Sequence, residues 1–191
     1  RDVLDLLNRS RDQTDAVRAI LKLIKNSTGV EAVGIRLREG DDFPYFMTNG
    51  LPDEFVRKES RLCARDTAGK IMRDTQGNPV LECMCGNVIC GRTNPARTFF
   101  SKAGSFWTNS TTALLASTSE QDRQARTRNR CNSKGYESVA LIPLRTGDDI
   151  VGLLQLNDRR RDRLTAEMIG FLENLGNSIG IAFARKKGED E

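Results

Sequence analysis

The stretch "SVALIPLRTGDDIVGLLQLND", residues 138–158, indicates the fold more strongly than any other part of the chain. It consists of two apolar runs separated by "TGDD", whose glycine and aspartates are typical of a tight turn. Each run is apolar on both faces at its centre, as expected of strands that are covered on two sides. The stretch therefore predicts an antiparallel hairpin at the centre of a sheet.

The flanking sequence predicts helices at both ends of the fold. Thr165 is expected to cap a helix over residues 165–187 whose apolar residues recur from Met168 to Phe183. Near the N-terminus, apolar residues from Val17 to Ile24 predict a helix that begins at Asp12 or Thr14 and ends at Gly29, after a lead-in helix over residues 1–11.

Between these helices, alternating patterns predict strands over 30–39, 43–48 and 104–109, and "NGLPDEFVRK" predicts a loop and a short helix. Residues 60–95 are rich in turns and contain the repeat "RDTAGK" and "RDTQGN". A long helix is expected over residues 117–135. The order of elements predicts one α+β domain, residues 1–191, with a central antiparallel sheet.

Composition excludes several classes of protein. Of 191 residues, 38% are hydrophobic and 29% charged, which describes an ordinary globular protein, and a net charge of +4 is too small to indicate nucleic-acid or membrane binding. No apolar run is long enough to span a membrane, and no export signal precedes the fold, so we expect a cytoplasmic protein with reduced cysteines. We also expect the chain to be a piece of a longer protein. It contains no histidine, which excludes Ser-His and Cys-His catalysis.

The hairpin of residues 138–158, the basic turn after it and the amphipathic helix that follows resemble the last part of a GAF domain. The opening, with a capped helix, Gly29, a strand around "VGIRL" and then "NGLPDEF", resembles the same family. In this resemblance "GNVICGR" takes the place of a glycine-rich entry to a helix, and residues 60–95 form an inserted loop. The resemblance implies a sheet of five or six strands with the terminal helices on one face and a small-molecule pocket on the other.

Residues 104–145 further resemble GAF sensor regions of multidomain bacterial and archaeal sensor histidine kinases. This implies a ligand- or redox-sensing regulatory domain of a two-component system, without catalytic activity, that passes its signal through the terminal helices. The alternative is a small thiol redox enzyme similar to free methionine-R-sulfoxide reductase, because "GNVICG" resembles one of the cysteine-containing turns of that family. Its further cysteine would fall near "SFWTNS", where this chain has none.

Three of the five cysteines lie within "LECMCGNVICG", residues 81–91. In an extended segment Cys83 and Cys85 would project to the same side, and Cys90 and Cys63 could complete a set of four thiolates that suits zinc or an iron–sulfur cluster. A reversible disulfide and simple burial of small apolar side chains remain alternatives. The cofactor is therefore open, and Cys63, Cys83, Cys85 and Cys90 are the candidate metal ligands.

Arginines suggest where a ligand binds. Arg123, Arg126 and Arg130 recur at a spacing that would place them on one face of the helix expected over 117–135. They either form a solvated face or bind an anionic ligand, such as a carboxylate or phosphate. As implied by the resemblance, this segment covers the pocket, and Trp107 and Asn109 are candidate pocket walls.

The terminal helices offer a surface for a second copy of the chain. The apolar stripe from Met168 to Phe183 is wider than one sheet face requires, and such helices pair in GAF sensors. We expect a parallel homodimer through these helices. No nucleic acid and no direct membrane contact are expected.

Overall fold

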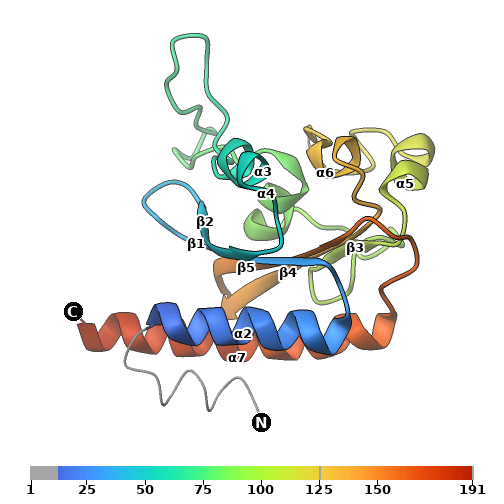
Figure 1. The fold of residues 1–191 in the computed structure, drawn as a ribbon. Helices are drawn as coiled ribbons and strands as arrows, with labels where there is room; N and C mark the ends of the chain where they lie inside the picture. Colours follow the sequence, from blue (N-terminus) through green and yellow to red (C-terminus); the bar gives the residue numbers. More distant parts are fainter. Residues whose placement is uncertain (1–12, 125, 191) are drawn as a thin grey trace.

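Residues 13–124 and 126–190 are described by a computed structural model of the chain (Figure 1). The predicted lead-in helix over residues 1–11, and the candidate cap Asp12, lie outside the described residues. None of the helices in the described part combines the length and the apolar composition needed to cross a lipid bilayer.

A five-stranded antiparallel sheet forms the centre of the molecule. Its strands are β1 (Ala32–Leu37), β2 (Tyr45–Asn49), β3 (Phe106–Thr108), β4 (Ser138–Thr146) and β5 (Asp149–Asp158), in the order β2-β1-β5-β4-β3. The predicted hairpin is confirmed: Thr146 pairs with Asp149 across a two-residue turn in which Gly147 adopts a φ of 61°. Its two strands hold central positions, which explains why they are apolar on both faces.

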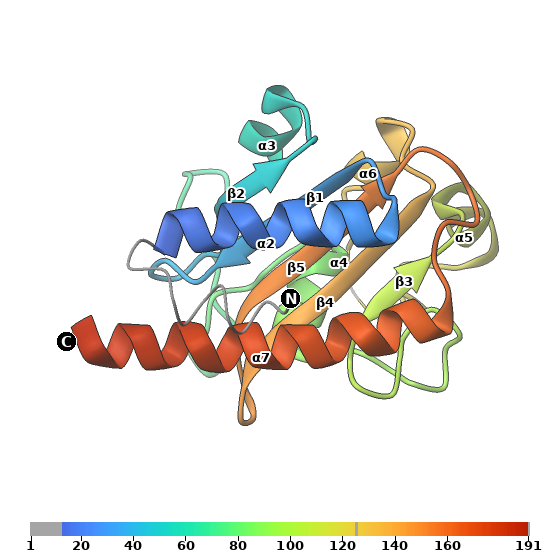
Figure 2. The same ribbon diagram turned by 60° about the horizontal axis from the view of Figure 1, so that its bottom comes forward.

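One face of the sheet is covered by α2 (Gln13–Thr28) and α7 (Ala166–Asp190), which lie side by side (Figure 2). Thr165 caps α7 as predicted, since its hydroxyl oxygen accepts a hydrogen bond of 3.1 Å from the Met168 amide. The helices bury their apolar stripes against the sheet in one core, which includes Ile20, Leu154 and Leu172.

Two glycines bring α7 close to β4. A side chain at Gly176 would contact the Pro143 carbonyl, and one at Gly180 would clash with the backbone of Arg145. Glycine usually weakens a helix interior, but here it allows the helix backbone to approach the strand.

The opposite face carries the short helices α3 (Asp53–Glu59), α4 (Cys83–Cys90), α5 (Thr111–Ser117) and α6 (Arg130–Ser133) (Figure 1). These helices pack on a second core, which includes Phe55, Val88 and Leu153. The "GNVICG" motif is not an entry to a helix as expected. Gly86 lies inside α4, where it packs against the backbone of Leu81, and Gly91 ends the helix with a φ of 73°.

The inserted segment projects from the body between α3 and α4 (Figure 1) and consists of two successive tight turns, one closed by the bridge between Arg65 and Ile71 and the other by the bridge between Arg73 and Pro79. Its sequence repeat is also a structural repeat. Asp66 accepts hydrogen bonds from the amides of Ala68 and Lys70, and Asp74 does the same for Gln76 and Asn78. These hydrogen bonds order the two turns locally.

The long helix predicted over 117–135 is wrong. After α5 the chain makes one turn held by reciprocal hydrogen bonds between Ser119 and Asp122, and α6 covers only four residues. Gln124 and Asn129 have φ values of 73° and 60°, which interrupt a right-handed helix at both points. We call residues 118–124 and 126–132 the lid segment.

Candidate functional site

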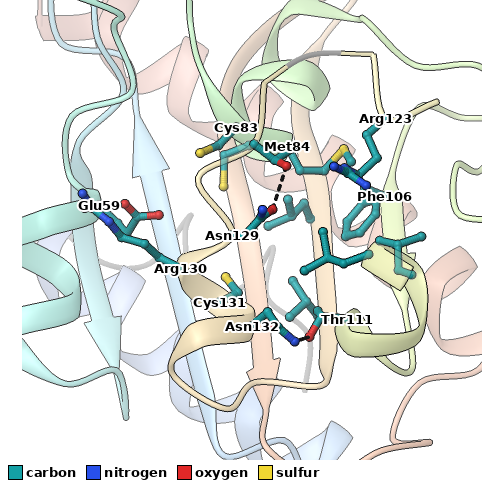
Figure 3. Close-up of a pocket in the computed structure, with 16 residues that line it drawn as sticks. Glu59, Cys83, Met84, Phe106, Thr111, Arg123, Asn129, Arg130, Cys131 and Asn132 are labelled. Carbon is teal, nitrogen blue, oxygen red and sulfur yellow. Dashed lines mark hydrogen bonds and ion pairs between the residues drawn. The ribbon is translucent and has the colours of Figure 1, made fainter. Parts of the chain in front are cut away.

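A cavity of about 80 Å³ lies on the sheet face opposite α2 and α7 (Figure 3). Its floor is the pocket-facing side of β4 and β3, and its walls come from α4, α5 and the lid segment. It is lined by Glu59, Cys83, Met84, Cys85, Phe106, Thr111, Leu114, Leu115, Arg123, Thr127, Asn129, Arg130, Cys131, Asn132, Val139 and Leu141. Nine of these sixteen residues are apolar or carry a thiol, and seven are polar or charged, five of which belong to the lid segment. An apolar site with a limited set of polar groups is typical of small-molecule binding.

Arg123 is the most unusual residue of the cavity. It is 7% exposed, and both hydrogen bonds of its guanidinium come from Nη1, to the carbonyl and hydroxyl oxygens of Thr118 at 2.9 and 2.7 Å. Its Nε is buried and has no acceptor. No carboxylate of the described residues lies within ion-pair distance of it: the adjacent Asp122 pairs with Arg97 and interacts with Arg123 only at longer range. A buried cation without a counterion is costly, so this group is suited to an anion.

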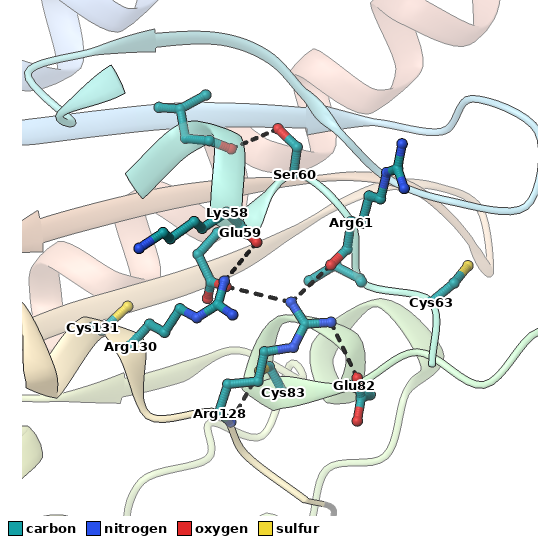
Figure 4. Close-up of polar contacts among 12 residues, drawn as sticks. Lys58, Glu59, Ser60, Arg61, Cys63, Glu82, Cys83, Arg128, Arg130 and Cys131 are labelled. Carbon is teal, nitrogen blue, oxygen red and sulfur yellow. Dashed lines mark hydrogen bonds and ion pairs between the residues drawn. The ribbon is translucent and has the colours of Figure 1, made fainter. Parts of the chain in front are cut away.

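A second group of charges closes one side of the cavity (Figure 4). Glu59, 6% exposed at the end of α3, accepts hydrogen bonds from Arg130 at 2.9 Å and Arg128 at 3.4 Å. Arg128 also pairs with Glu82 at 3.2 Å. We call these four residues the arginine clasp. The clasp attaches the lid segment to α3 and to the start of α4, and its charges balance within it.

Three thiols lie at the cavity, those of Cys83, Cys85 and Cys131. Burial raises the pKa of Cys83 to about 12 and also raises the pKa of Cys85 and of Cys131. These groups are therefore neutral thiols at neutral pH, and a neutral thiol is a poor nucleophile and metal ligand. Cys83 also holds the lid segment, since its sulfur accepts a hydrogen bond from the Arg128 amide.

A buried polar row continues from the cavity beneath the clasp. The Arg36 guanidinium lies over the ring of Tyr45, whose hydroxyl donates to Gln155 at 2.7 Å. Gln155 in turn donates to Asn157. Unlike Arg123, Arg36 donates to three backbone carbonyls, and it does not line the cavity.

The structure separates the predicted ligand-binding residues into two groups. Arg123 and Arg130 line the cavity, whereas Arg126 is exposed and contributes only its backbone carbonyl, which accepts from the Cys83 amide. The expectation that the three share one helix face is wrong, because that helix is not formed.

Trp107 and Asn109 do not line the cavity. They line a separate open groove, and Trp107 packs on the core under α2 and α7. The Asn109 amide group bonds at both ends to the backbone of Leu164, at 2.9 Å each, so its role is structural.

The predicted metal site is not assembled. Within residues 13–124 and 126–190 no group of three or more acidic or cysteine side chains is placed to hold a metal. Residues 83–90 form a helix instead of an extended segment, so Cys83 and Cys85 point to different sides of it. Cys90 is exposed at the far end of α4, and the Cys63 sulfur lies 3.2 Å from the Asp41 carbonyl oxygen. The residues therefore do not fit zinc or an iron–sulfur cluster.

Sequence reasoning missed Glu59, Thr111, Thr118 and Asn132. The Asn132 amide donates to the Thr111 hydroxyl at 3.0 Å and so links α6 to α5 (Figure 3). None of these residues belongs to a local motif, because each acquires its role from a partner elsewhere in the fold. The one available signal was the excess of arginine between residues 123 and 130.

Comparisons with known proteins agree with the fold. The profile of the GAF domain family matches residues 12–183. Comparison with curated proteins gives no match.

Among solved structures, the GAF domain of a phosphoenolpyruvate-protein phosphotransferase from Coxiella burnetii is similar with a TM-score of 0.64 and 16% identity, covering 98% of this chain and 92% of that one. A domain assigned to a two-component sensor histidine kinase from Sinorhizobium meliloti 1021 has a TM-score of 0.59 and 13% identity, covering 94% and 97%. Free methionine-R-sulfoxide reductase from Neisseria meningitidis, in complex with its substrate, has a TM-score of 0.62 and 12% identity, covering 98% and 87%. At these identities the likeness concerns the fold alone.

Proposed function

The chain belongs to the GAF domain family, and from this premise we propose that it is a ligand-sensing regulatory domain of a signal-transduction protein, of the sensor histidine kinase class. A small anionic molecule binds in the cavity under the lid segment, and the domain itself catalyses no reaction. The chain contains no histidine, so a phosphoacceptor histidine would belong to another part of such a kinase.

The observation that carries this proposal is that the buried Arg123 at the cavity has an Nε without an acceptor and no carboxylate of the described residues within ion-pair distance. The arginines of the clasp differ from Arg123 because each of them has a carboxylate partner, in Glu59 or Glu82. An anion in the cavity would supply the missing acceptor and the missing charge.

A direct contact between the cavity wall and α7 supports a signalling role. Phe106 lines the cavity, and the preceding Ser105 donates a hydrogen bond of 2.6 Å to Glu173 of α7. Ser101 donates to the same carboxylate oxygen at 2.6 Å. A ligand that moves Phe106 therefore acts on a segment that is bonded to the terminal helix, which provides a route for coupling the two sites.

The second candidate is a thiol redox enzyme acting on a sulfoxide, like free methionine-R-sulfoxide reductase. The presence of three thiols at the cavity favours it. Their raised pKa values argue against it, because the reactive form of cysteine is the thiolate. Turnover of free methionine sulfoxide with a thiol reductant, lost in Cys83→Ser, would establish the enzyme.

The proposal is tested by screening small metabolites for an increase in the thermal stability of the 191-residue chain, followed by amide hydrogen exchange with each hit. We expect a ligand to slow exchange both in the lid segment and in α7. A ligand that protects the lid segment but leaves α7 unchanged would show a binding module that does not signal through this helix.

A further inference from the structure

We propose that the ligand of the cavity is a monocarboxylate of two or three carbons, bound through the free edge of the Arg123 guanidinium. This inference rests on the proposed function and names the chemical class of the molecule that is sensed. Three features of the cavity lead to it: the geometry of Arg123, the balance of charge, and the size of the space.

The first feature is which atoms of Arg123 are free. Nη1 is occupied by the two oxygens of Thr118, whereas neither Nε nor Nη2 donates to an acceptor in the described residues. These two nitrogens form one edge of the planar guanidinium, and their N–H bonds are parallel. Two parallel donors match the two oxygens of a carboxylate, so a bidentate pair is favoured.

This edge is held in place before any ligand arrives. The Arg123 carbonyl oxygen accepts a hydrogen bond of 2.6 Å from Asn87, which is fully buried in α4. Asn87 is itself oriented by Arg92, which donates to its side-chain oxygen at 2.9 Å. The backbone of Arg123 is thus anchored through Asn87 and its side chain through Thr118. A donor fixed in this way loses little conformational entropy on binding.

The second feature is charge. Arg128 and Arg130 are balanced by Glu59 and Glu82 within the arginine clasp. Arg123 has no ion-pair partner among the described residues and interacts only at longer range with Asp122, which pairs with Arg97. The cavity therefore matches a ligand with a single negative charge. A phosphate monoester, with close to two charges and three acceptor oxygens, would leave charge and acceptors unmatched.

The third feature is size. An apolar cavity of about 150 Å³ holds benzene, so a cavity of about 80 Å³, roughly half that volume, favours a ligand with few non-hydrogen atoms. Acetate and propionate have four and five such atoms. The lining beyond Arg123 includes Phe106, Leu114, Val139 and Leu141, which suits a short alkyl group.

Binding of sodium salts of linear acids from formate to valerate to the 191-residue chain, measured by isothermal titration calorimetry, tests the inference. Propionamide serves as the neutral isostere of propionate, and inorganic phosphate as the competing anion. We expect acetate or propionate to bind best, with dissociation constants between about 10 µM and 1 mM because so few atoms make contact. Propionamide and phosphate should bind at least about tenfold more weakly.

Variants locate the site. Arg123→Gln should weaken propionate binding by about ten- to hundredfold, and Arg123→Lys should restore only part of it because an ammonium group cannot form the bidentate pair. Arg126→Gln is the matched control, since this exposed arginine of the same segment should leave binding unchanged. Should Arg123→Gln fail to fold, Leu115→Ala provides an independent readout: it widens the cavity from a partly exposed position and should move the preference to butyrate or valerate.

Equal binding of propionamide and propionate, tighter binding of phosphate, or no binding of any monocarboxylate at about 10 mM would each overturn the inference. If a ligand of another class binds and is sensitive to Leu115→Ala, the carboxylate assignment fails while the sensing function stands. If no compound of any class shows that sensitivity, the sensing function fails as well.

Discussion

At the scale of single residues, Glu59 shows how a charge can determine the position of a distant segment. It is a buried carboxylate at the end of α3, and its partners Arg128 and Arg130 lie about seventy residues later in the chain. Burying a carboxylate is tolerated only when it is paired and hydrogen-bonded. The lid segment is therefore held to α3 by a charge pair that neither segment could form alone.

We predict that Glu59→Gln lowers the free energy of unfolding by about 1–3 kcal/mol, because it leaves Arg130 without a counterion and removes one of the two carboxylate partners of Arg128. Urea denaturation measures the effect. Glu54→Gln in the same helix is the control: Glu54 pairs with Lys58 in solvent, and its loss should be undetectable. Equal effects of the two substitutions would contradict the role of the clasp.

The five thiols differ in accessibility. Cys90 is exposed, whereas Cys63, Cys83, Cys85 and Cys131 are buried or partly buried. We predict that a disulfide reagent at neutral pH reacts rapidly with one thiol of the native chain and with all five in denaturant, and that Cys90→Ser removes the rapid phase. A reversible loss of two thiols on mild oxidation would instead establish redox switching.

At the scale of elements, α7 is connected to the pocket side of the sheet by hydrogen bonds as well as by packing. The hydroxyls of Ser101 and Ser105 both donate to Glu173, and Ser105 is fully buried. Hydrogen bonds to a charged group are among the stronger ones in proteins. This contact and the close approach of Gly176 and Gly180 to β4 attach α7 to the sheet.

We predict that replacing both Ser101 and Ser105 by Ala lowers the free energy of unfolding by about 2–4 kcal/mol, because the Glu173 carboxylate loses two donors. It should also remove the ligand-dependent change of amide exchange in α7 while leaving propionate affinity nearly unchanged. Urea denaturation measures the stability, hydrogen exchange with and without ligand measures the response of α7, and calorimetry measures the affinity for propionate. Asn177→Ala, at an exposed position of α7, is the control. If the double variant keeps the ligand response in α7, the signal takes another route.

At the scale of the whole molecule, five carboxylates of the described residues have lowered pKa values in the folded state, and three of them, Asp42, Glu137 and Asp158, are at least partly buried. Burial acts to raise the pKa of Asp42, Glu137 and Asp158, but it is outweighed by hydrogen bonds from backbone amides, from Thr112 and from Arg160 respectively. A carboxyl group with a lowered folded pKa stabilises the fold above its unfolded pKa and loses this contribution as the pH falls.

Acid should therefore destabilise the chain. We predict that the free energy of unfolding is nearly constant from about pH 7 to 5 and falls by about 1–3 kcal/mol below about pH 4. The cysteines affect stability at alkaline pH. Because the pKa of Cys63 and of Cys83 is raised to about 12, stability should also decline above about pH 8.5, where the unfolded thiols ionise. Urea titrations across pH measure both limits. Asp158→Asn should reduce the acid sensitivity, and stability that rises below about pH 4 would contradict the assignment.

The outer face of α7 is the surface through which we expect two copies of the chain to associate. Phe171 and Ile181 are 58% and 56% exposed there, which is unusual for side chains of this size. We predict a homodimer through the terminal helices in sedimentation equilibrium, which Phe171→Glu with Ile181→Glu converts to monomer. Met72→Glu is the control, because Met72 is also exposed, at 47%, but lies in the inserted segment. A monomeric wild-type chain at high concentration would refute the dimer for this chain.

The hairpin of residues 138–158, the cap at Thr165, the stripes of α2 and α7 and the α+β class followed from the sequence by itself, because each depends on periodicity and turn chemistry within a few neighbouring residues. The repeat in residues 65–78 was visible in the sequence for the same reason. The family resemblance was visible there too, since it depends on the order of these local patterns.

The site was decided by tertiary structure. Arg123 and Arg130 could be chosen as candidates because of their charge, but the helix that was to align them does not form, and Trp107, Asn109 and Arg126 lie elsewhere. The cysteines are close in sequence, yet α4 turns them apart. A cavity, an unpaired guanidinium and a clasp between α3 and the lid segment all depend on contacts between residues far apart in the chain, and no local pattern of residues encodes such contacts.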